Sequence, residues 1–188
     1  MKPHRLRIIT GRLKNRGIAA PPGTDTRPSL EKTRGIIFDT LASRIDLGQF
    51  QAIDLFAGSG ALGIEAYSRG TEPVYFLERG AAYKTLTKNV LTLLPPDSFF
   101  LFHQDGLAWL RKTQFSGRPC LFLLDPPYQF GMGQKALDLI AQKTDQLPGT
   151  WVVLEADRLD TPNLDSRLTL VTTKYIGRSR LDFIEILQ

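Results

Sequence analysis

Four consecutive residues with an unusual combination of chemistries, Asp125-Pro126-Pro127-Tyr128, follow directly after the apolar run at 120–124. The two prolines fix the backbone and remove two N–H donors, so the carbonyl groups around them stay free to accept. Asp125 and the Pro126 carbonyl can then accept both hydrogens of a planar amino group, which exposes the nitrogen lone pair to a methyl donor. Tyr128 offers an aromatic face on which a base can stack. We therefore predict Asp125, Pro126, Pro127 and Tyr128 as the catalytic residues.

A second group of residues, 52–66, combines a strand, a glycine-rich turn and the start of a helix. Gly58 and Gly60 lack a Cβ, so a ligand can approach the backbone, and the helix start supplies unpaired N–H groups. Asp54 lies inside the apolar strand, where a carboxylate is costly unless it has a partner such as a ligand ammonium. The spacing to Gly63 also fits a dinucleotide site, so this motif alone leaves NAD open.

Acidic residues follow the next two predicted strands. Glu78 comes about twenty residues after the glycine turn and can accept hydrogen bonds from ribose hydroxyls. Asp105 can accept from an adenine amino group or cap the helix that follows, and both roles are compatible. Carboxyl ends of neighbouring parallel strands meet in one crevice, so these residues are expected to converge there. The predicted cofactor-binding set is Asp54, Phe56, Ala57, Gly58, Ser59, Gly60, Glu78, Arg79, Asp105 and Gly106.

Charge is unevenly distributed along the chain. Residues 1–50 hold ten basic and four acidic side chains, or +6, which leaves −1 for the other 138 residues of a chain with net charge +5. Such an asymmetry is typical of a segment that contacts phosphates. We expect that removing residues 1–20 leaves a folded body without RNA affinity. The predicted RNA contacts are Arg7, Arg12, Lys14, Arg16, Arg27 and Arg34.

The apolar runs alternate with helical patterns, which predicts an α/β fold with a doubly wound, mostly parallel, seven-stranded sheet. A C-terminal antiparallel hairpin around Gly177 is expected at its edge, and a small β-hairpin extension at the N-terminus. The predicted domains are 1–28, the basic extension and loop, and 29–188, the body. The expected strands are 52–56, 74–77, 99–102, 120–124, 151–155, 168–173 and 181–187, and the expected helices are 30–45 (capped by Ser29), 61–69, 81–94, 106–113 and 134–143.

Composition narrows the class of protein. Cys120 is the only cysteine and there are two histidines, so neither an internal disulfide nor a metal site is expected. The N-terminus lacks the apolar core of a signal peptide, and no apolar run reaches membrane-spanning length. We expect a cytoplasmic monomer that does not associate with membranes.

The motifs together resemble a known family. RIITG at 7–11, TRPS at 26–29, EKTRGIIFDTL at 31–41, LFAGSGALGIEAYSRG at 55–70 and LDPPY at 124–128 are similar to the RsmD-type enzymes. The resemblance implies a Rossmann-like methyltransferase domain that binds S-adenosyl-L-methionine and methylates N2 of a guanine in 16S ribosomal RNA. It implies that the partner is this RNA or the small ribosomal subunit. The sequence departs from the family at Gly35, where relatives commonly carry a glutamate.

Three alternatives remain open from the residues, of which the weakest is a methyltransferase of protein glutamine side chains, because it would leave the basic N-terminus without a use. An aspartate–proline–proline–tyrosine motif also serves N6-adenine DNA methyltransferases, although the first fifty residues leave little room for a DNA-reading domain. A noncatalytic RNA-binding or ribosome-assembly module could retain the fold, although it would have no reason to keep Asp54, Glu78, Asp105 and Asp125 together.

Overall fold

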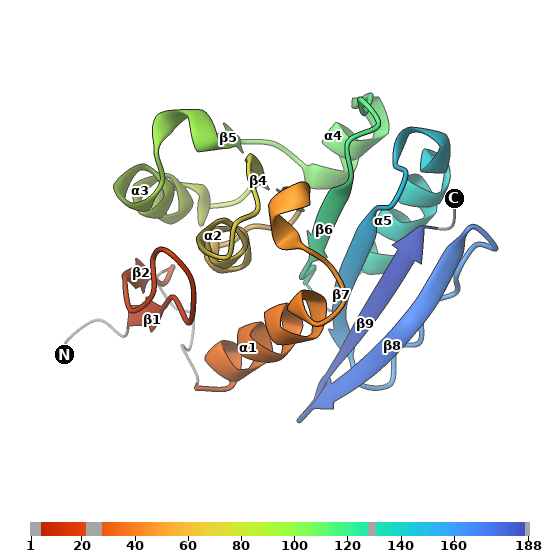
Figure 1. Ribbon diagram of the computed structural model, residues 1–188, viewed down its shortest axis with the longest axis horizontal. Coiled ribbons are helices and arrows are strands. Elements are labelled where there is room, and N and C mark those ends of the chain that lie inside the picture. Colours follow the sequence, from red (N-terminus) through yellow and green to blue (C-terminus); the bar gives the residue numbers. More distant parts are fainter. Residues whose placement is uncertain (1–4, 22–27, 128–130, 187–188) are drawn as a thin grey trace.

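The computed structural model describes residues 5–21, 28–127 and 131–186. Its centre is a seven-stranded sheet with strand order β5-β4-β3-β6-β7-β9-β8 (Figure 1). The predicted fold class is confirmed. The strands are β3 (Gln51–Asp54), β4 (Val74–Leu77), β5 (Phe99–Phe102), β6 (Cys120–Leu124), β7 (Trp151–Asp157), β8 (Leu168–Ile176) and β9 (Ser179–Ile186).

Strand order determines where a ligand can bind. The strands from β5 to β7 are parallel, whereas β9 runs antiparallel to both β7 and β8. The chain winds outward from β3 toward β5 in the first half and from β6 toward β8 in the second. Open α/β sheets bind ligands outside the strand carboxyl ends at such a reversal, here between β3 and β6.

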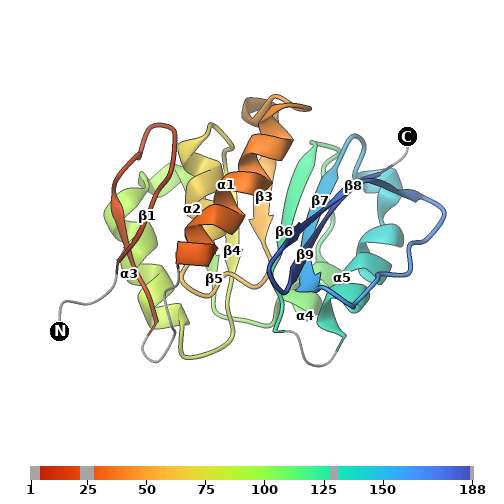
Figure 2. The same cartoon turned by 90° about the horizontal axis from the view of Figure 1, so that it is seen from below.

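Helices cover both faces of the sheet, as Figures 1 and 2 show. One apolar cluster joins the first three helices to alternate strand residues such as Phe76 and Leu123, and the second joins the last two helices to Phe122 and Leu154. Alternation along each strand therefore feeds two separate cores. The helices are α1 (Pro28–Ala42), α2 (Ala61–Ser68), α3 (Tyr83–Leu93), α4 (Gly106–Lys112) and α5 (Met132–Ala141). None of the helices among the described residues is long and apolar enough to cross a membrane.

Short 3₁₀ turns complete the connections, and one helix boundary differs from the expectation. Ser29 lies inside α1 and is not its cap, because the helix begins at Pro28. Proline suits a first helical position, since its fixed φ is already helical and its missing N–H needs no partner. The 3₁₀ turns are η1 (Leu47–Gln49), η2 (Pro96–Ser98) and η3 (Thr144–Gln146).

The N-terminal segment forms an antiparallel hairpin of β1 (Arg5–Arg7) and β2 (Gly17–Ala19). It lies against α2 and α3 in Figure 1, and Leu6, Ile8 and Ile18 are buried in the first core. The packing argues against the expectation that the body folds without residues 1–20, because their removal would open that core to water. The domain division at 28 and 29 stays a prediction.

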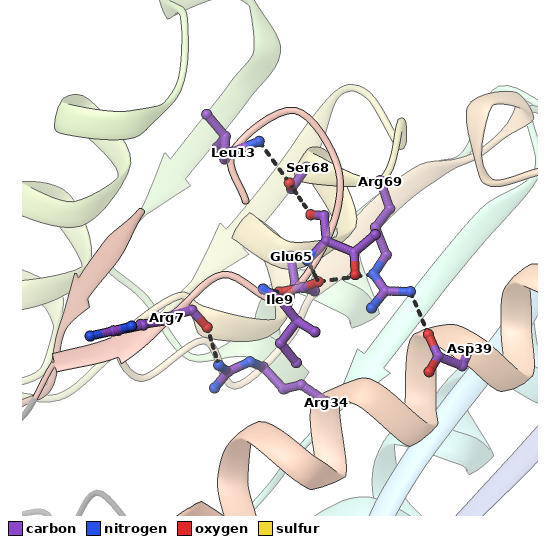
Figure 3. Close-up of polar contacts among 9 residues, drawn as sticks. Arg7, Ile9, Leu13, Arg34, Asp39, Glu65, Ser68 and Arg69 are labelled. Carbon is purple, nitrogen blue, oxygen red and sulfur yellow. Dashed lines mark hydrogen bonds and ion pairs between the residues drawn. The ribbon is translucent and has the colours of Figure 1, made fainter. Parts of the chain in front are cut away.

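A buried carboxylate fastens this hairpin to α2 (Figure 3). Glu65 is fully buried and accepts from the backbone N–H groups of Ile9 and Thr10 at 2.9 and 3.1 Å and from Nε of Arg69 at 2.9 Å. Nη1 of Arg69 also forms an ion pair with Oδ1 of Asp39 in α1, at 2.8 Å. Three donors around one carboxylate offset the cost of burying its charge. The hairpin is thus a fixed part of the fold.

Candidate functional site

Asp54 stands at the carboxyl end of β3, beneath the glycine loop. Its Oδ2 accepts from the N–H of Gly63 at 2.9 Å, whereas Oδ1 is buried with no protein partner among the described residues. Burial raises the pKa of the Asp54 carboxyl to about 7, and the nearby Glu78 adds to the rise. A buried acceptor without a donor is costly, so a cationic or N–H-bearing ligand would relieve it.

The glycine loop that follows has the backbone shape the sequence suggested. Gly58 and Gly60 have φ of +54° and +81°, which an L side chain rarely adopts. Gly60 immediately precedes α2, so the loop presents the amino end of that helix to the crevice. Glu78, after β4, accepts from the N–H of Gly58 at 3.0 Å and also from that of Gly80. The carboxylate thereby fixes the position of the loop. Each of its oxygens has a second acceptor position, which suits a hydrogen bond from a ligand hydroxyl.

Asp105 is the N-cap of α4, which was one of its two expected roles. Its Oδ1 accepts from the N–H of Ala108 at the start of α4, and its Oδ2 pairs with Nη1 of Arg79, each at 2.9 Å. The side chain is therefore oriented before any ligand binds. Each oxygen retains one lone pair, so acceptance from an adenine amino group remains geometrically open.

These residues line two adjoining hollows of about 140 and 390 Å³, which together we call the crevice. The first hollow lies at Asp54 and the glycine loop, and the second extends past Glu78 to Asp105. Among the residues predicted to bind the cofactor, Gly60 alone lines neither, because it closes the loop below them. Arg34 lines the smaller hollow, a position that charge counting did not indicate. The predicted cofactor-binding residues on these walls are Asp54, Phe56, Ala57, Gly58, Ser59, Glu78, Arg79, Asp105 and Gly106.

Asp125 lines both hollows, immediately after β6. Its side chain is accessible from the crevice. Desolvation by the protein atoms around it, together with the neighbouring Glu155 and Asp54 carboxylates, raises the pKa of Asp125 to about 8. Pro126 and Pro127 line the larger hollow. Tyr128 lies outside the described residues, so its predicted stacking role stays a prediction.

A third hollow of about 620 Å³, which we call the outer hollow, also has the two prolines in its wall. Pro126 and Pro127 form one wall, and the segment after β7, including Leu159 and Thr161, forms another. Leu159, at the rim of this hollow, is 87% exposed. Neither this segment nor Glu155 was predicted as part of the site, although a carboxylate at the end of the fifth parallel strand carries the same signal as Glu78 and Asp105.

The segment after β7 is held in place although it has no regular secondary structure. Nη1 of Arg180 donates to the Thr161 hydroxyl at 2.7 Å. Gln134 of α5 pairs with the backbone of Asn163 through two hydrogen bonds of 2.8 and 2.9 Å. The wall is thus formed in advance of any ligand.

The basic residues predicted to contact RNA fall into different environments. Arg7, Lys14 and Arg16 are exposed on the N-terminal hairpin. Arg12 is exposed too, but it stacks 4.0 Å above the Tyr67 ring and pairs with Glu72 at 3.4 Å.

Arg34 is 4% exposed and donates to the Arg7 carbonyl at 2.7 Å (Figure 3), so its buried side chain is not available to an RNA phosphate in this structure. Arg34 instead connects the hairpin to the smaller hollow. Arg27 lies outside the part of the chain that the structure describes.

The arrangement places the turn that was predicted to hold an amine at the edge of the two adjoining hollows. The carboxylates suit hydroxyl and amino donors, and the glycine loop suits close approach of a ligand to the backbone. Among the described residues, no cluster of three His, Cys, Asp or Glu side chains could hold a metal ion. The predicted chemistry of these carboxylates and of the turn after β6 is the orientation of an amine beside a bound nucleoside.

Comparisons with known proteins agree with this geometry. A family model described as "Conserved hypothetical protein 95" matches residues 6–185. The YlbH protein of Bacillus subtilis (strain 168) is 36% identical over 179 residues, covering 92% of this chain and 94% of that protein. Ribosomal RNA small subunit methyltransferase D of Buchnera aphidicola subsp. Acyrthosiphon pisum (strain APS) is 30% identical, covering 94% and 91%. The solved structure of YhhF from Escherichia coli has the same fold, with a TM-score of 0.82 at 24% identity, covering 97% and 98%.

Proposed function

This chain belongs to the RsmD-type family, described as Conserved hypothetical protein 95, and on that basis we propose that it methylates N2 of a guanine in 16S ribosomal RNA. S-adenosyl-L-methionine is the methyl donor. The observation that carries the proposal is the position of Asp125, which lines both parts of the nucleoside-sized crevice while the prolines beside it line the outer hollow. A donor in the crevice and an amine in the outer hollow would meet at that residue.

The crevice fits this donor by the chemistry of its walls. The unpartnered Oδ1 of Asp54 needs a donor, which the ammonium of the methionyl group can provide. Glu78 would accept from the ribose hydroxyls, and Asp105 would accept from the adenine amino group. The glycine loop leaves space against its backbone. Phe56, Ala57, Ser59, Arg79 and Gly106 complete the walls.

The bound cofactor supplies an electrophilic methyl group, and the protein's own groups prepare the nitrogen that receives it. An amine conjugated with a purine ring is a poor nucleophile because its lone pair is delocalised. Asp125 and the Pro126 carbonyl would accept its two N–H groups and favour a pyramidal nitrogen. Pro127 would keep the turn rigid, and Tyr128 would stack on the base. Catalysis of this kind depends on positioning and on well-placed acceptors.

Asp125 has a further task in the same step. The nitrogen that gains a methyl group must lose a proton, and the carboxylate already bonded to that N–H is the nearest acceptor. The upward shift in the pKa of Asp125, caused by burial and by the neighbouring carboxylates, makes its carboxylate form a stronger base than that of an ordinary aspartate. Proton transfer to this carboxylate would complete the reaction without a covalent intermediate.

RNA would be held mainly through phosphates. Arg7, Lys14 and Arg16 form the exposed basic set on the hairpin, with Arg12 beside them and Arg27 as a further proposed contact. Phosphate contacts position a nucleic acid without reading its sequence. The proposed partner is 16S ribosomal RNA or the small ribosomal subunit, bound by a monomer in the cytoplasm.

The direct test is transfer of a labelled methyl group from S-adenosyl-L-methionine to 16S ribosomal RNA and to small subunits lacking methylation. Digestion to nucleosides and mass spectrometry should identify N2-methylguanosine. Transfer that yields N6-methyladenosine instead, or transfer to duplex DNA alone, would contradict the proposal.

A further inference from the structure

Glu155 and Asp125 stand side by side at the carboxyl edge of the sheet. The last paired residues of β6 and β7 are Leu124 and Leu154, so the two acidic residues follow at equivalent positions on adjacent parallel strands. Residues alternate between faces, and both therefore point away from the face on which Leu124 and Leu154 are buried. Their proximity also shows in their electrostatics, since Glu155 raises the pKa of Asp125.

Glu155 is the acidic residue that connects the hollows. It lines the smaller part of the cofactor crevice together with Asp125, and it also lines the outer hollow together with Pro126. Only 8% of Glu155 is exposed, and burial of a carboxylate to this degree costs free energy unless the carboxylate makes polar interactions. A ligand in the outer hollow whose amine reaches Asp125 would thus present its neighbouring atoms to Glu155.

The Glu155 side chain is held in a defined orientation. The Ser179 hydroxyl of β9 donates to Oε1 of Glu155 at 2.7 Å. Each carboxylate oxygen can accept more than one hydrogen bond, so a carboxylate held by Ser179 can also accept from an N–H of a ligand. Ser179 itself pairs in register with Asp157 of β7, which fixes its backbone beside the crevice.

An acceptor beside the amine-holding turn distinguishes the two purines. In guanine two ring nitrogens flank the amine, and one of them, N1, carries a hydrogen and is a donor, whereas N3 is an acceptor. In adenine the ring nitrogen next to the amine is also N1, but there it is an acceptor. A carboxylate at that place would bind guanine and repel adenine, because two facing acceptors leave both groups unpaired.

We propose, on the basis of the proposed function, that Glu155 is the residue that selects guanine, by accepting the N1 hydrogen while Asp125 and the Pro126 carbonyl hold the amine. Ser179 is the positioning residue that orients the Glu155 carboxylate. The turn after β6 by itself can hold the amine of guanine or that of adenine. Glu155, beside this turn, would supply the discrimination between the two bases.

The test compares two RNA substrates that differ at the target nucleotide, one with guanine and one with 2-aminopurine. The analogue keeps the N2 amine but has no hydrogen on N1. The parent protein should prefer guanine, and Glu155→Gln should reduce the ratio of the two kcat/KM values by about tenfold to a hundredfold, the range expected for a hydrogen bond to a charged group. Because the ratio is compared between parent and variant, the missing O6 of the analogue cancels to first order.

Two further variants locate the effect. Ser179→Ala should reduce the ratio in part, because the carboxylate remains but loses its orientation, and Ser179→Thr should restore it. Glu185→Gln removes an acidic residue from the opposite end of the same strand pair, where Glu185 faces Trp151, and should leave the ratio unchanged. Thermal unfolding and S-adenosyl-L-methionine binding of each variant establish that it is folded.

Each outcome discriminates. If the parent methylates guanine and Glu155→Gln keeps the parent ratio, the selection by Glu155 is wrong while the proposed function stands. If Glu155→Gln weakens cofactor binding with an unchanged ratio, Glu155 belongs to the cofactor site and the inference is also overturned. If the parent transfers no methyl group to guanine in any RNA substrate, the proposed function itself fails.

Discussion

The Glu78 carboxylate accepts a 3.0 Å hydrogen bond from the backbone N–H of Gly58, which ties the end of β4 to the glycine loop after β3. Glu78 therefore shapes the loop, and under the proposed function it would also accept from the ribose hydroxyls. Glu78→Gln should raise the Kd for S-adenosyl-L-methionine about tenfold or more, as expected for loss of charge-assisted hydrogen bonds. Isothermal titration calorimetry measures this directly. Binding of NAD in place of S-adenosyl-L-methionine would contradict the assignment of the crevice.

Replacement of Asp125 separates chemistry from cofactor binding. Asp125→Ala should reduce kcat by about a hundredfold to a thousandfold, because the acceptor for the target amine is lost. The Kd for the cofactor should change little. Asp97, exposed at the opposite edge of the sheet, provides the control, and Asp97→Ala should retain parent activity. An Asp125→Ala protein with near-parent turnover would show that this carboxylate only ends the strand.

Asp54 should couple stability to pH. Its pKa is raised in the folded protein from 3.8 to about 7, so the folded state binds more protons than the unfolded state between those values. The free energy of unfolding should therefore fall as pH rises from about 4 to 7, by at most about 4 kcal/mol from this group.

Asp54→Asn tests that coupling, because the amide oxygen can still accept from Gly63 while the buried charge is removed. The variant should show a smaller fall than the parent in urea unfolding at pH 5 and pH 8, and should bind S-adenosyl-L-methionine more weakly. Equal pH dependence in the two proteins would mean that Asp54 does not hold the excess proton.

Phosphate contacts on the hairpin predict steep salt dependence. Four exposed cations, Arg7, Arg12, Lys14 and Arg16, would give a slope of RNA affinity against salt of about −3 on logarithmic axes, at about −0.7 per phosphate for single strands. Lys14→Ala should reduce the slope by about one contact. Lys112→Ala, on the opposite face of the sheet, should not. A salt-independent affinity would exclude the hairpin as the RNA contact.

The hairpin should also be required for folding. Deletion of residues 1–20 removes the two backbone donors of Glu65, those of Ile9 and Thr10, and uncovers the core that Ile8 and Ile18 help to fill. We expect the shortened chain to lose the cooperative thermal transition of the parent, followed by circular dichroism. Arg16→Ala, which changes an exposed residue of the same segment, should keep it. A shortened chain that unfolds cooperatively near the parent Tm would contradict this role.

The sequence predicted the sheet and most of the crevice well, for a physical reason. Buried parallel strands are continuous apolar runs, and the residue that follows each run must lie at the carboxyl edge, so Glu78, Asp105 and Asp125 could be placed without coordinates. Strand order and alternation then bring such residues together.

Other features depend on long-range contacts that no local pattern reveals. From the sequence, Ile8 and Ile18 look like ordinary hairpin residues, and only the structure shows that they are buried in a core that includes residues of α2. Arg34 likewise looks like a surface cation, whereas in the structure it donates to the Arg7 carbonyl. The segment after β7 has no periodicity, and its place in the site depends on Arg180 and Thr161, which are distant along the chain. Glu155 could have been found by the strand-end rule.

The most direct test of the central claim is mass spectrometry of ribosomal RNA nucleosides from a strain that lacks this protein. The account predicts that 16S ribosomal RNA loses one N2-methylguanosine, that the parent gene restores it, and that the Asp125→Ala gene does not. An unchanged N2-methylguanosine content in 16S ribosomal RNA, or a loss confined to N6-methyladenosine, would contradict it.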